Sequence, residues 1–207
     1  MAQQKMVDRS AWRALGEMGA LLPSVPEAYG GLGATFAYDA AVLEDIESVV
    51  PEVTTGVSVH SAIVAHYILN YGSEEQKLRW LPKMASGEFV GAIAMTEPGT
   101  GSDLQGVRTT ARKQGNNYVI NGQKTFITNG QTADLIIVVG AHRRATAPRA
   151  LSLIVARDRG QRGFRRGRNL DKIGLHASDT SGTVLRQCRW RRRKTCSAPR
   201  KATASSS

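Results

Sequence analysis

The hydrophobic pattern changes its period near Phe89, and this change constrains the fold more than any other feature of the sequence. Before it, apolar residues recur at helical spacing, as Trp12, Leu15 and Met18 do in the first candidate helix. After it, short apolar runs are separated by turn residues, a pattern typical of strands. We therefore predict an α+β fold, in which an N-terminal helical domain is followed by an antiparallel β-domain.

Each predicted helix has a recognisable start. Ser10 and Thr35 are suitable N-cap residues for the first and second helices, and Pro51 suits the first turn of the third. Ser73 and Gln76 have the spacing of a capping box at the start of the fourth. The predicted helices are 10–19, 36–49, 51–71 and 73–84, and the predicted strands are 90–96, 107–113, 118–121, 123–128, 134–139 and 151–156, with an exposed loop at 142–149.

The chain is basic, but its charge is unevenly distributed. The formal net charge of the 207 residues is +11. From Arg186 to the end there are eight basic residues and no acidic one, which leaves 20 basic against 17 acidic residues before that point. A nearly neutral body argues against a nucleic-acid partner, and none is predicted. Cys188 and Cys196 both lie in the basic end, so they give no indication of a disulfide in the body.

The sequence gives no signal for a membrane span, a signal peptide or a metal site. No apolar run approaches the roughly 20 residues of a membrane span, so no span is predicted. The first residues lack the apolar region of a signal peptide, and we expect a cytoplasmic location. His60 and His66 fall in the third predicted helix without Cys, Asp or Glu at ligand spacing. Packing or capping is therefore expected for both, and no metal site is predicted.

Residues 91–106 combine a short run of small apolar residues with a glycine-rich turn. The run 91–95 suits a buried strand, which ends before Pro98-Gly99-Thr100-Gly101. The hydroxyl groups of Thr96 and Ser102 flank the turn, so the segment offers donors and close backbone approach to a planar, anionic ligand. An ordinary strand and turn would account for these residues equally well. Neither G-x-G-x-x-G nor G-x-x-x-x-G-K-[ST] occurs in the chain.

Residues 119–130 contain two Asn-Gly pairs that bracket a six-residue strand. Asn-Gly favours tight turns, so a turn is predicted at each end of this strand. The strand would present Phe126 and Thr128 on one face, where the ring can pack on a flavin and the hydroxyl can bond a ring nitrogen. Ordinary core packing is the alternative, and it is the commoner role of aromatic residues at strand spacing.

Taken together, these two stretches resemble acyl-CoA dehydrogenases. The resemblance covers residues 9–181, and the order of its motifs along the chain agrees with that family. Residues 57–65 and 103–111 look most like the long-chain type. The motifs that carry the resemblance are residues 95–103 and 121–130, supported by 25–33, 71–77 and 163–175.

The resemblance implies a partial N-terminal helical domain at 1–87 and a middle β-domain at 88–181. Residues 182–207 form a basic tail without family similarity, which we expect to be disordered. The family has Glu-Leu-Phe-Phe-Asp where this chain has Gly182-Thr-Val-Leu-Arg186. Codons for these residues, read one base later, can encode the family's residues, so we interpret the tail as out of frame. The family's C-terminal four-helix domain is therefore expected to be absent, and the start is expected to be short of the family's first helices.

The reaction implied by the resemblance is FAD-dependent α,β-dehydrogenation of a fatty acyl-CoA to the trans-2-enoyl-CoA. In the family, electrons pass to an electron-transferring flavoprotein, and the enzymes are homo-oligomers. The family's catalytic glutamate lies in the C-terminal domain, so no catalytic residue is assigned here, and Glu97 matches a structural residue. Ser102 also matches a substrate contact. The residues that match FAD contacts are Ile93, Ala94, Met95, Thr96, Glu97, Pro98, Gly99, Thr100, Gly101, Ser102, Phe126, Ile127 and Thr128.

Two alternatives stay open from the sequence. We expect the chain alone to be inactive, but it could instead be a non-catalytic module that binds flavin, acyl-CoA or a partner. A second choice concerns a set of basic residues after the predicted strands. It forms either a solvated strand face or a contact with CoA phosphates or a partner subunit. This set comprises Arg162, Arg165, Arg166, Arg168 and Lys172.

Overall fold

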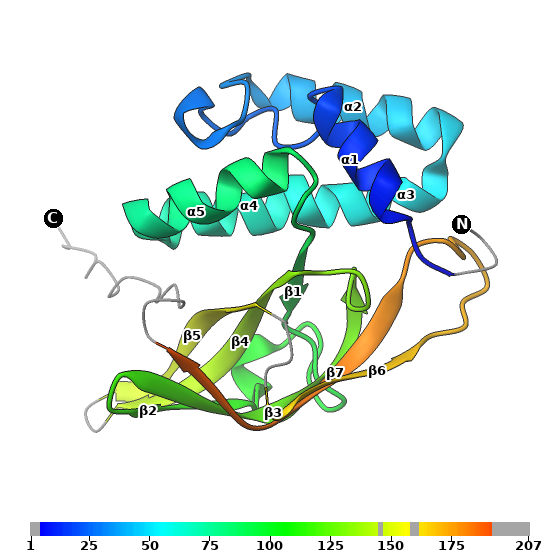
Figure 1. The fold of residues 1–207 in the computed structure, drawn as a ribbon. Helices are drawn as coiled ribbons and strands as arrows, with labels where there is room; N and C mark the ends of the chain where they lie inside the picture. Colours follow the sequence, from blue (N-terminus) through cyan, green and yellow to red (C-terminus); the bar gives the residue numbers. More distant parts are fainter. Residues whose placement is uncertain (1–4, 145–146, 158–161, 192–207) are drawn as a thin grey trace, which may run out of the picture.

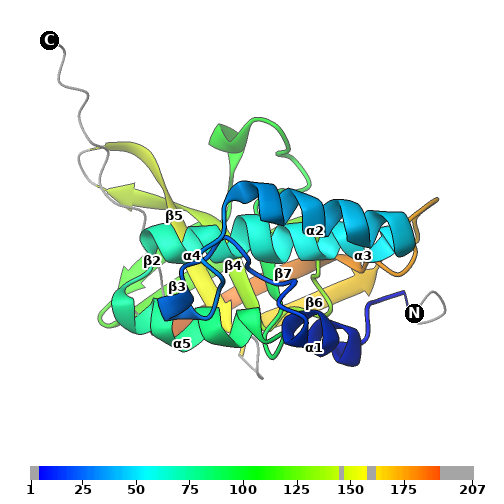
Figure 2. The same cartoon turned by 90° about the horizontal axis from the view of Figure 1, so that it is seen from above.

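The computed structural model describes residues 5–144, 147–157 and 162–191. A layer of helices lies over a curled sheet (Figure 1), so the predicted α+β class is confirmed. Seen from above, the longer helices lie side by side across the sheet (Figure 2). No helix in these ranges is long and apolar enough to cross a membrane.

The helices follow the predicted ranges closely. They are α1 (Arg9–Glu17), α2 (Phe36–Val49), α3 (Pro51–Ser58), α4 (Ala65–Tyr71) and α5 (Glu74–Ala85). A π-helical segment, η3 (Val59–Val64), joins α3 to α4, so 51–71 is one helical stretch. The described residues also form two short 3₁₀ turns, η2 (Glu27–Tyr29) and η4 (Leu104–Gly106).

Of the helix starts predicted at Ser73 and at Ser10, the first is correct and the second is wrong. The capping box is confirmed, because Ser73 and Gln76 exchange both expected hydrogen bonds. The prediction that Ser10 caps the first helix is wrong, since Asp8 is the N-cap residue of α1. Because α1 ends at Glu17, Met18 does not join the buried face and its residue surface is 78% exposed.

In the described residues, seven strands form one mixed, mainly antiparallel sheet. The order is β1-β4-β2-β3-β7-β6, with β5 also paired to β4. Among the strands described, only the pairings of β4 with β1 and with β2 are parallel. The strands are β1 (Gly91–Ala94), β2 (Thr110–Gln114), β3 (Asn117–Thr128), β4 (Leu135–Arg144), β5 (Ala147–Arg157), β6 (Phe164–Asn169) and β7 (Thr180–Arg191).

Strand β4 is buried on both faces and so joins two cores. Leu135 and Ile137 belong to the core that lies under the helices. Trp12 is part of the same core. Ile136 and Val138 face the interior of the curled sheet. This position explains the uninterrupted apolar run at the start of β4, because neither face of the strand meets water.

Two polar side chains tie the helices to the sheet. His60, in η3, accepts a hydrogen bond from the Gly91 N–H (3.0 Å) and donates one to the Met84 carbonyl (3.1 Å). Burial lowers the pKa of His60 to about 4, so the ring is neutral near pH 7. The side-chain amide of Asn129 donates to the carbonyls of Gly56 (2.9 Å) and Gly91 (3.0 Å). The packing role predicted for His60 therefore fits its contacts.

The predicted turn at Asn121-Gly122 is wrong. Strand β3 continues through this position with a register shift between Ile120 and Gly122. A Cβ added at Gly122 would lie 2.2 Å from the Thr109 hydroxyl, so glycine is needed there for close packing and not for a turn. The second pair does form a turn, because Asn129 adopts a left-handed φ of 60°.

The exposed loop predicted at 142–149 is also wrong over most of its length. Strands β4 and β5 continue into this segment and pair as far as Arg144 and Ala147. Backbone pairing with a neighbour does not require an apolar period, so the sequence pattern gave no signal for it. Residues 145 and 146 lie outside the described residues.

The prediction of disorder after Ser181 is wrong for the first part of the tail. Residues up to Arg191 form β7, which pairs with β3 and β6. Leu185 and Cys188 face the sheet interior and are buried, so this segment has enough apolar contact to be ordered. Burial raises the pKa of the Cys188 thiol to about 11. Residues 192–207, including Cys196, lie outside the described residues.

Strand β7 also places a polar side chain, that of Thr183, in the interior. Thr183 is buried, and its hydroxyl has no hydrogen-bond partner among the residues described. We expect Thr183→Val to raise the free energy of unfolding by about 1 kcal/mol, because the isosteric methyl removes an unsatisfied buried hydroxyl. Urea denaturation would measure the change. As a control, Thr180→Val should be destabilising, since the Thr180 hydroxyl accepts a bond from Lys172 (3.1 Å). Loss of stability in Thr183→Val would contradict this account.

Candidate functional site

The turn after β1 closes on itself through backbone hydrogen bonds. The N–H of Glu97 donates to the Thr100 carbonyl (2.9 Å), and the N–H of Thr100 donates to the Glu97 carbonyl (3.0 Å). Pro98 and Gly99 form the exposed tip between them. A Cβ added at Gly99 or Gly101 would meet nothing within 4 Å, and neither residue has a positive φ. The fold itself therefore does not require glycine at these two positions.

Below the turn, the Glu97 carboxylate is buried and fully engaged. It accepts hydrogen bonds from the N–H groups of Arg108 (2.8 Å) and Thr109 (2.9 Å) and from the Lys124 ammonium (2.9 Å). Burial alone would raise the pKa of Glu97, but the donors from Thr109, Arg108 and Lys124 together lower it. A carboxylate held ionised by three donors is a poor proton acceptor, so Glu97 is a structural group and not a base.

Lys124 is a site residue that the sequence reasoning missed. Its side chain is fully buried, and the ammonium also donates to the Met95 carbonyl (2.8 Å). Burial lowers the pKa of Lys124, while Glu97 opposes that shift. Lys124 lies between Gly122 and Phe126 in the predicted motif, which could have drawn attention to it. A lysine in a strand is usually solvated, however, so the sequence alone did not indicate a buried role. Only the inward register of β3 shows that this one anchors the turn.

Strand β3 contains a bulge that turns Phe126 outward. The register shifts between Lys124, opposite Thr183, and Ile127, opposite Ser181. Within the bulge, Phe126 has a left-handed φ of 56° and its residue surface is 65% exposed. Such a conformation is unusual for an aromatic residue and is often found at binding sites. The regular alternation predicted for Phe126 and Thr128 is therefore interrupted.

The two predicted stretches lie next to each other. The N–H of Thr125 donates to the Thr96 carbonyl (3.0 Å), and Lys124 links the same strand to Met95. Four of the predicted cofactor residues are buried and support the fold: Ala94, Glu97, Thr100 and Ile127. The others are half-buried or exposed, and so can meet a ligand: Ile93, Met95, Thr96, Pro98, Gly99, Gly101, Ser102, Phe126 and Thr128.

The basic set at 162–172, most of which lies in β6, divides into two groups. Arg166 donates to the Ala133 carbonyl (2.6 Å), and Lys172 donates to the Ser178 carbonyl as well as to Thr180. These two side chains hold loops of this chain together. The remaining members, Arg162, Arg165 and Arg168, are exposed.

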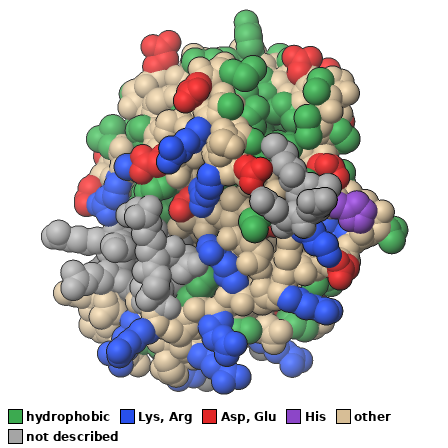
Figure 3. All heavy atoms as spheres, turned by 45° about the vertical axis from the view of Figure 1, so that its right-hand side comes forward, with side chains coloured by type: hydrophobic (Ala, Val, Ile, Leu, Met, Phe, Trp, Pro, Cys, Tyr) green, Lys and Arg blue, Asp and Glu red, His purple; other side chains and the backbone are tan. Residues whose placement is uncertain are grey.

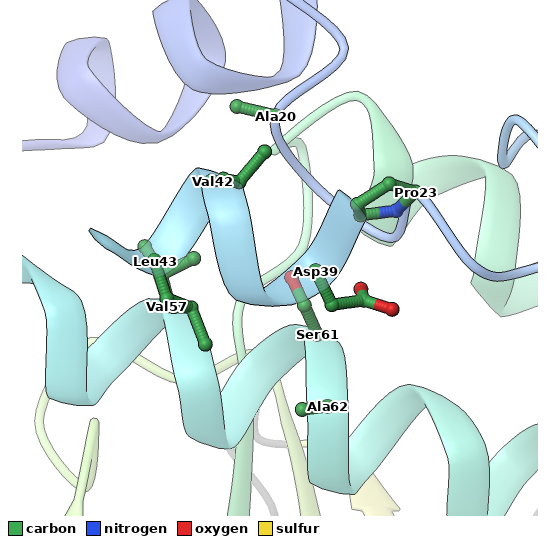
Figure 4. A pocket seen from close by; sticks show the side chains of 8 residues that line it. All are labelled: Ala20, Pro23, Asp39, Val42, Leu43, Val57, Ser61 and Ala62. Atoms are coloured by element: carbon green, nitrogen blue, oxygen red, sulfur yellow. The ribbon is translucent and has the colours of Figure 1, made fainter. Parts of the chain in front are cut away.

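Two hollows lie away from the glycine-rich turn. One, between α2 and η3, has a volume of about 10 Å³, enough for about one water molecule. Asp39 is buried in it, and its carboxylate oxygens have no hydrogen-bond partner in the described part of the chain (Figure 4). The other, of about 290 Å³, is lined by residues such as Arg9, Asp134 and Arg166. Neither contains a predicted cofactor residue.

The described ranges contain no group of three or more His, Cys, Asp or Glu side chains placed to hold a metal ion. His60 is engaged with backbone groups, as described above, and His66 lies 3.0 Å from the Ser24 hydroxyl. Both histidines therefore have hydrogen-bond partners within the fold.

Comparison with known proteins gives matches over nearly the whole chain. The family model "Acyl-CoA dehydrogenase, N-terminal domain" matches residues 1–88, and "Acyl-CoA dehydrogenase, middle domain" matches residues 92–188. The long-chain specific acyl-CoA dehydrogenase of Sus scrofa is 46% identical over 177 residues, which are 84% of this chain and 41% of that protein. The isovaleryl-CoA dehydrogenase of Pongo abelii is 36% identical over 183 residues, 87% of this chain and 43% of that protein.

Solved structures show the same similarity. An acyl-CoA dehydrogenase from Geobacillus kaustophilus superimposes with a TM-score of 0.88 and 45% identity, covering 95% of this chain and 52% of that one. A glutaryl-CoA dehydrogenase from Mycobacterium smegmatis, in complex with FADH2, has a TM-score of 0.86 and 29% identity, covering 94% of this chain and 48% of that one. The chain thus spans about two fifths of the length of the curated relatives and about half of these structures.

Proposed function

The chain belongs to the acyl-CoA dehydrogenase family, and on that premise we propose that it forms the flavin-facing wall of an FAD-dependent dehydrogenase site. The observation that carries the proposal is the open glycine turn. A Cβ added at Gly99 or Gly101 would meet nothing within 4 Å, and neither glycine has a positive φ. Glycines without an internal cause are expected where a ligand must approach the backbone closely.

The residues around the turn suit a flavin. Thr96 and Thr128 are half-buried residues with hydroxyl side chains, and Phe126 is an exposed aromatic residue in the β3 bulge. Thr96 and Phe126 are held near each other because Thr125 bonds to the Thr96 carbonyl. In this proposal the hydroxyl groups bond the ring system, Phe126 packs on it, and the glycine backbone approaches the anionic part.

When bound, FAD supplies the hydride acceptor for oxidation of the substrate. The contribution of this chain is to bind and orient the flavin and to exclude water from one side of it. Glu97 does not exchange a proton during the reaction, because its carboxylate is already held by three donors. We assign the α-proton acceptor to no residue in the described ranges.

The substrate we propose is a fatty acyl-CoA, with Ser102 as a contact. Ser102 is exposed on the glycine turn and is therefore open to a substrate. Relatives of the long-chain and isovaleryl types favour an acyl-CoA thioester but differ in chain length. For the intact protein we propose transfer of electrons to an electron-transferring flavoprotein and assembly as a homo-oligomer. One similar structure, with a TM-score of 0.88 and 31% identity, is that of an electron-transferring flavoprotein of Acidaminococcus fermentans.

A titration of the purified chain with FAD tests the proposal. We expect weak binding, visible as quenching of flavin fluorescence at high protein concentration. Gly101→Val should abolish it without lowering stability, because the added side chain meets only the ligand. Gly174→Val is a matched control, since Gly174 also has open space around it but lies outside the turn. Equal binding by wild type and Gly101→Val would contradict the flavin assignment.

The same preparation should not oxidise acyl-CoA at a useful rate. Absence of a general base alone removes a factor of about 10²–10⁴ in rate, and incomplete positioning adds to that loss. The measurement is reduction of an artificial electron acceptor with added FAD and an acyl-CoA series, compared with an intact acyl-CoA dehydrogenase. Substrate-dependent reduction at a rate near that of the intact enzyme would reveal a base that the described residues do not show.

A second candidate function is a non-catalytic flavin- or acyl-CoA-binding module. It is favoured by the contrast between the two neighbouring segments that suit a flavin and the Glu97 carboxylate below the turn, which is already engaged by donors of the protein. Flavin retained through mild purification, together with no dehydrogenation, would favour this function over an inactive part of an enzyme.

A further inference from the structure

The small hollow between α2 and η3 has a polar part and an apolar part. Asp39 of α2 and Ser61 of η3 form the polar part, whereas the other side chains that line the hollow, such as Leu43 and Val57, are apolar. In the close view, the carboxylate of Asp39 lies between α2 and the helical stretch that carries Ser61 (Figure 4). The hollow is enclosed within the helical layer, on a different part of the molecule from the charged sheet end seen in Figure 3.

Asp39 is the only buried residue of α2, a helix that the structure describes completely. Its surface is 4% exposed, and neither carboxylate oxygen has a hydrogen-bond partner among the residues described. Taking a carboxylate out of water is costly unless other hydrogen bonds replace those that it made to water. A buried group of this kind therefore requires a partner, such as a bound water molecule or an ion.

Ser61 supplies the second polar group of the hollow. It is buried, and its side-chain oxygen accepts a hydrogen bond from the Leu22 N–H (3.3 Å). A hydroxyl group can donate one hydrogen bond while it accepts another. The bond from Leu22 is the only one that this hydroxyl makes among the described residues, so its proton can serve a partner inside the hollow.

The backbone beside the hollow departs from regular α-helical geometry. Ser61 lies within η3, the π-helical segment, at whose end the Ala65 N–H donates to the carbonyl of His60, five residues earlier. Such π-helical segments are rare, and they occur frequently at functional sites. The unpartnered carboxylate and the π-helical backbone thus distinguish the same place in the helical layer by two independent features.

We propose that the hollow binds one water molecule, which donates a hydrogen bond to the Asp39 carboxylate and accepts one from the Ser61 hydroxyl. The volume of about 10 Å³ matches a single water molecule, which needs two to four polar partners. A cation such as Ca²⁺ takes six or more oxygen ligands. Asp39 and Ser61 are the only lining residues with side-chain oxygens, so the site suits water and not a metal ion.

The bridge has a consequence for how α2 is held. Leu43 and Ile46 of this helix pack against the core but are only half-buried. Phe36 and Tyr38, at the start of the helix, are exposed. Since α2 buries little apolar surface, the water-mediated contact of Asp39 completes its attachment to η3.

A crystal structure of the full chain that shows ordered water molecules tests the proposal. Crystals grown with rubidium chloride reveal a monovalent cation by its anomalous scattering, which water lacks. The expected result is one density peak within hydrogen-bond distance of both Asp39 and Ser61, without an anomalous signal. An anomalous peak, a direct bond between the two side chains, or a hollow without density would each overturn the assignment.

A double-mutant cycle in urea denaturation tests the bridge in solution. Ser61→Ala should raise the unfolding equilibrium constant about threefold less in the Asp39→Ala background than in the wild type, because the water has then already lost one partner. Val57→Ala is the matched control, since Val57 lines the same hollow without a polar group. Its effect should agree within about twofold in the two backgrounds.

Two outcomes of the cycle would reject the bridge. Additive effects of Asp39→Ala and Ser61→Ala would show that no water couples the two side chains. Equal coupling of Asp39→Ala to Val57→Ala would show that the shape of the hollow couples them instead. Circular dichroism checks that each variant is folded, and the crystallographic test does not depend on the folding of any variant.

Discussion

Replacing Lys124 by methionine is expected to lower the free energy of unfolding by about 3–5 kcal/mol, the usual cost of breaking a buried ion pair. The Lys124 side chain is fully buried, and its partner Glu97 is 6% exposed. The substitution leaves the Glu97 carboxylate with only the two backbone donors and leaves the Met95 carbonyl without its lysine. Urea denaturation followed by circular dichroism would measure the loss.

Two variants and a pH series separate the ion pair from general packing. Lys113→Met, at an exposed position of β2, should change stability by less than about 0.5 kcal/mol. Adding Glu97→Gln to Lys124→Met should recover part of the loss, because no buried charge then remains. The pKa of Glu97 is lowered on folding, so the contribution of the pair is complete above the unfolded pKa and is lost as the pH falls through the folded one. A loss below about 1 kcal/mol in Lys124→Met would mean that the pair is not what holds the turn.

Asn129→Leu is expected to be the second strongly destabilising substitution, with a loss of about 3–5 kcal/mol. It leaves the carbonyls of Gly56 and Gly91 without the amide donors, and each unsatisfied buried group costs about 1–3 kcal/mol. The left-handed φ of 60° at this position adds strain for a residue other than Gly or Asn. Because the amide joins α3 to β1, hydrogen exchange should increase at the contact between the two layers.

Asn129→Gly distinguishes the two contributions. Glycine tolerates the left-handed conformation, so this variant loses the amide hydrogen bonds without the backbone strain. It should therefore be more stable than Asn129→Leu but less stable than the wild type. Asn70→Leu, at an exposed position of α4, serves as the surface control and should change stability little. Wild-type stability in Asn129→Gly would show that the amide bonds to the two carbonyls contribute nothing.

The sequence alone determined the fold class and most helix positions, because these depend on local signals. The change of period near Phe89, the cap at Ser73 and the proline at position 51 each act over a few residues, and the structure follows them. The family motifs likewise identified residues 95–103 and 121–130, which the structure brings side by side. The flavin contacts assigned to these residues stay a prediction.

The tertiary structure alone decided which side chains in those motifs face inward. Gly122 is a packing glycine and not a turn residue because Thr109, distant in the sequence, lies against it. Lys124 is buried because it pairs opposite buried Thr183 of β7 and so lies on the inward face of β3, where it reaches Glu97. Residues 182–191 are ordered because β3 and β6 supply backbone partners that no local pattern records. Strand pairing is a contact between distant segments, and local periodicity carries no information about which segments meet.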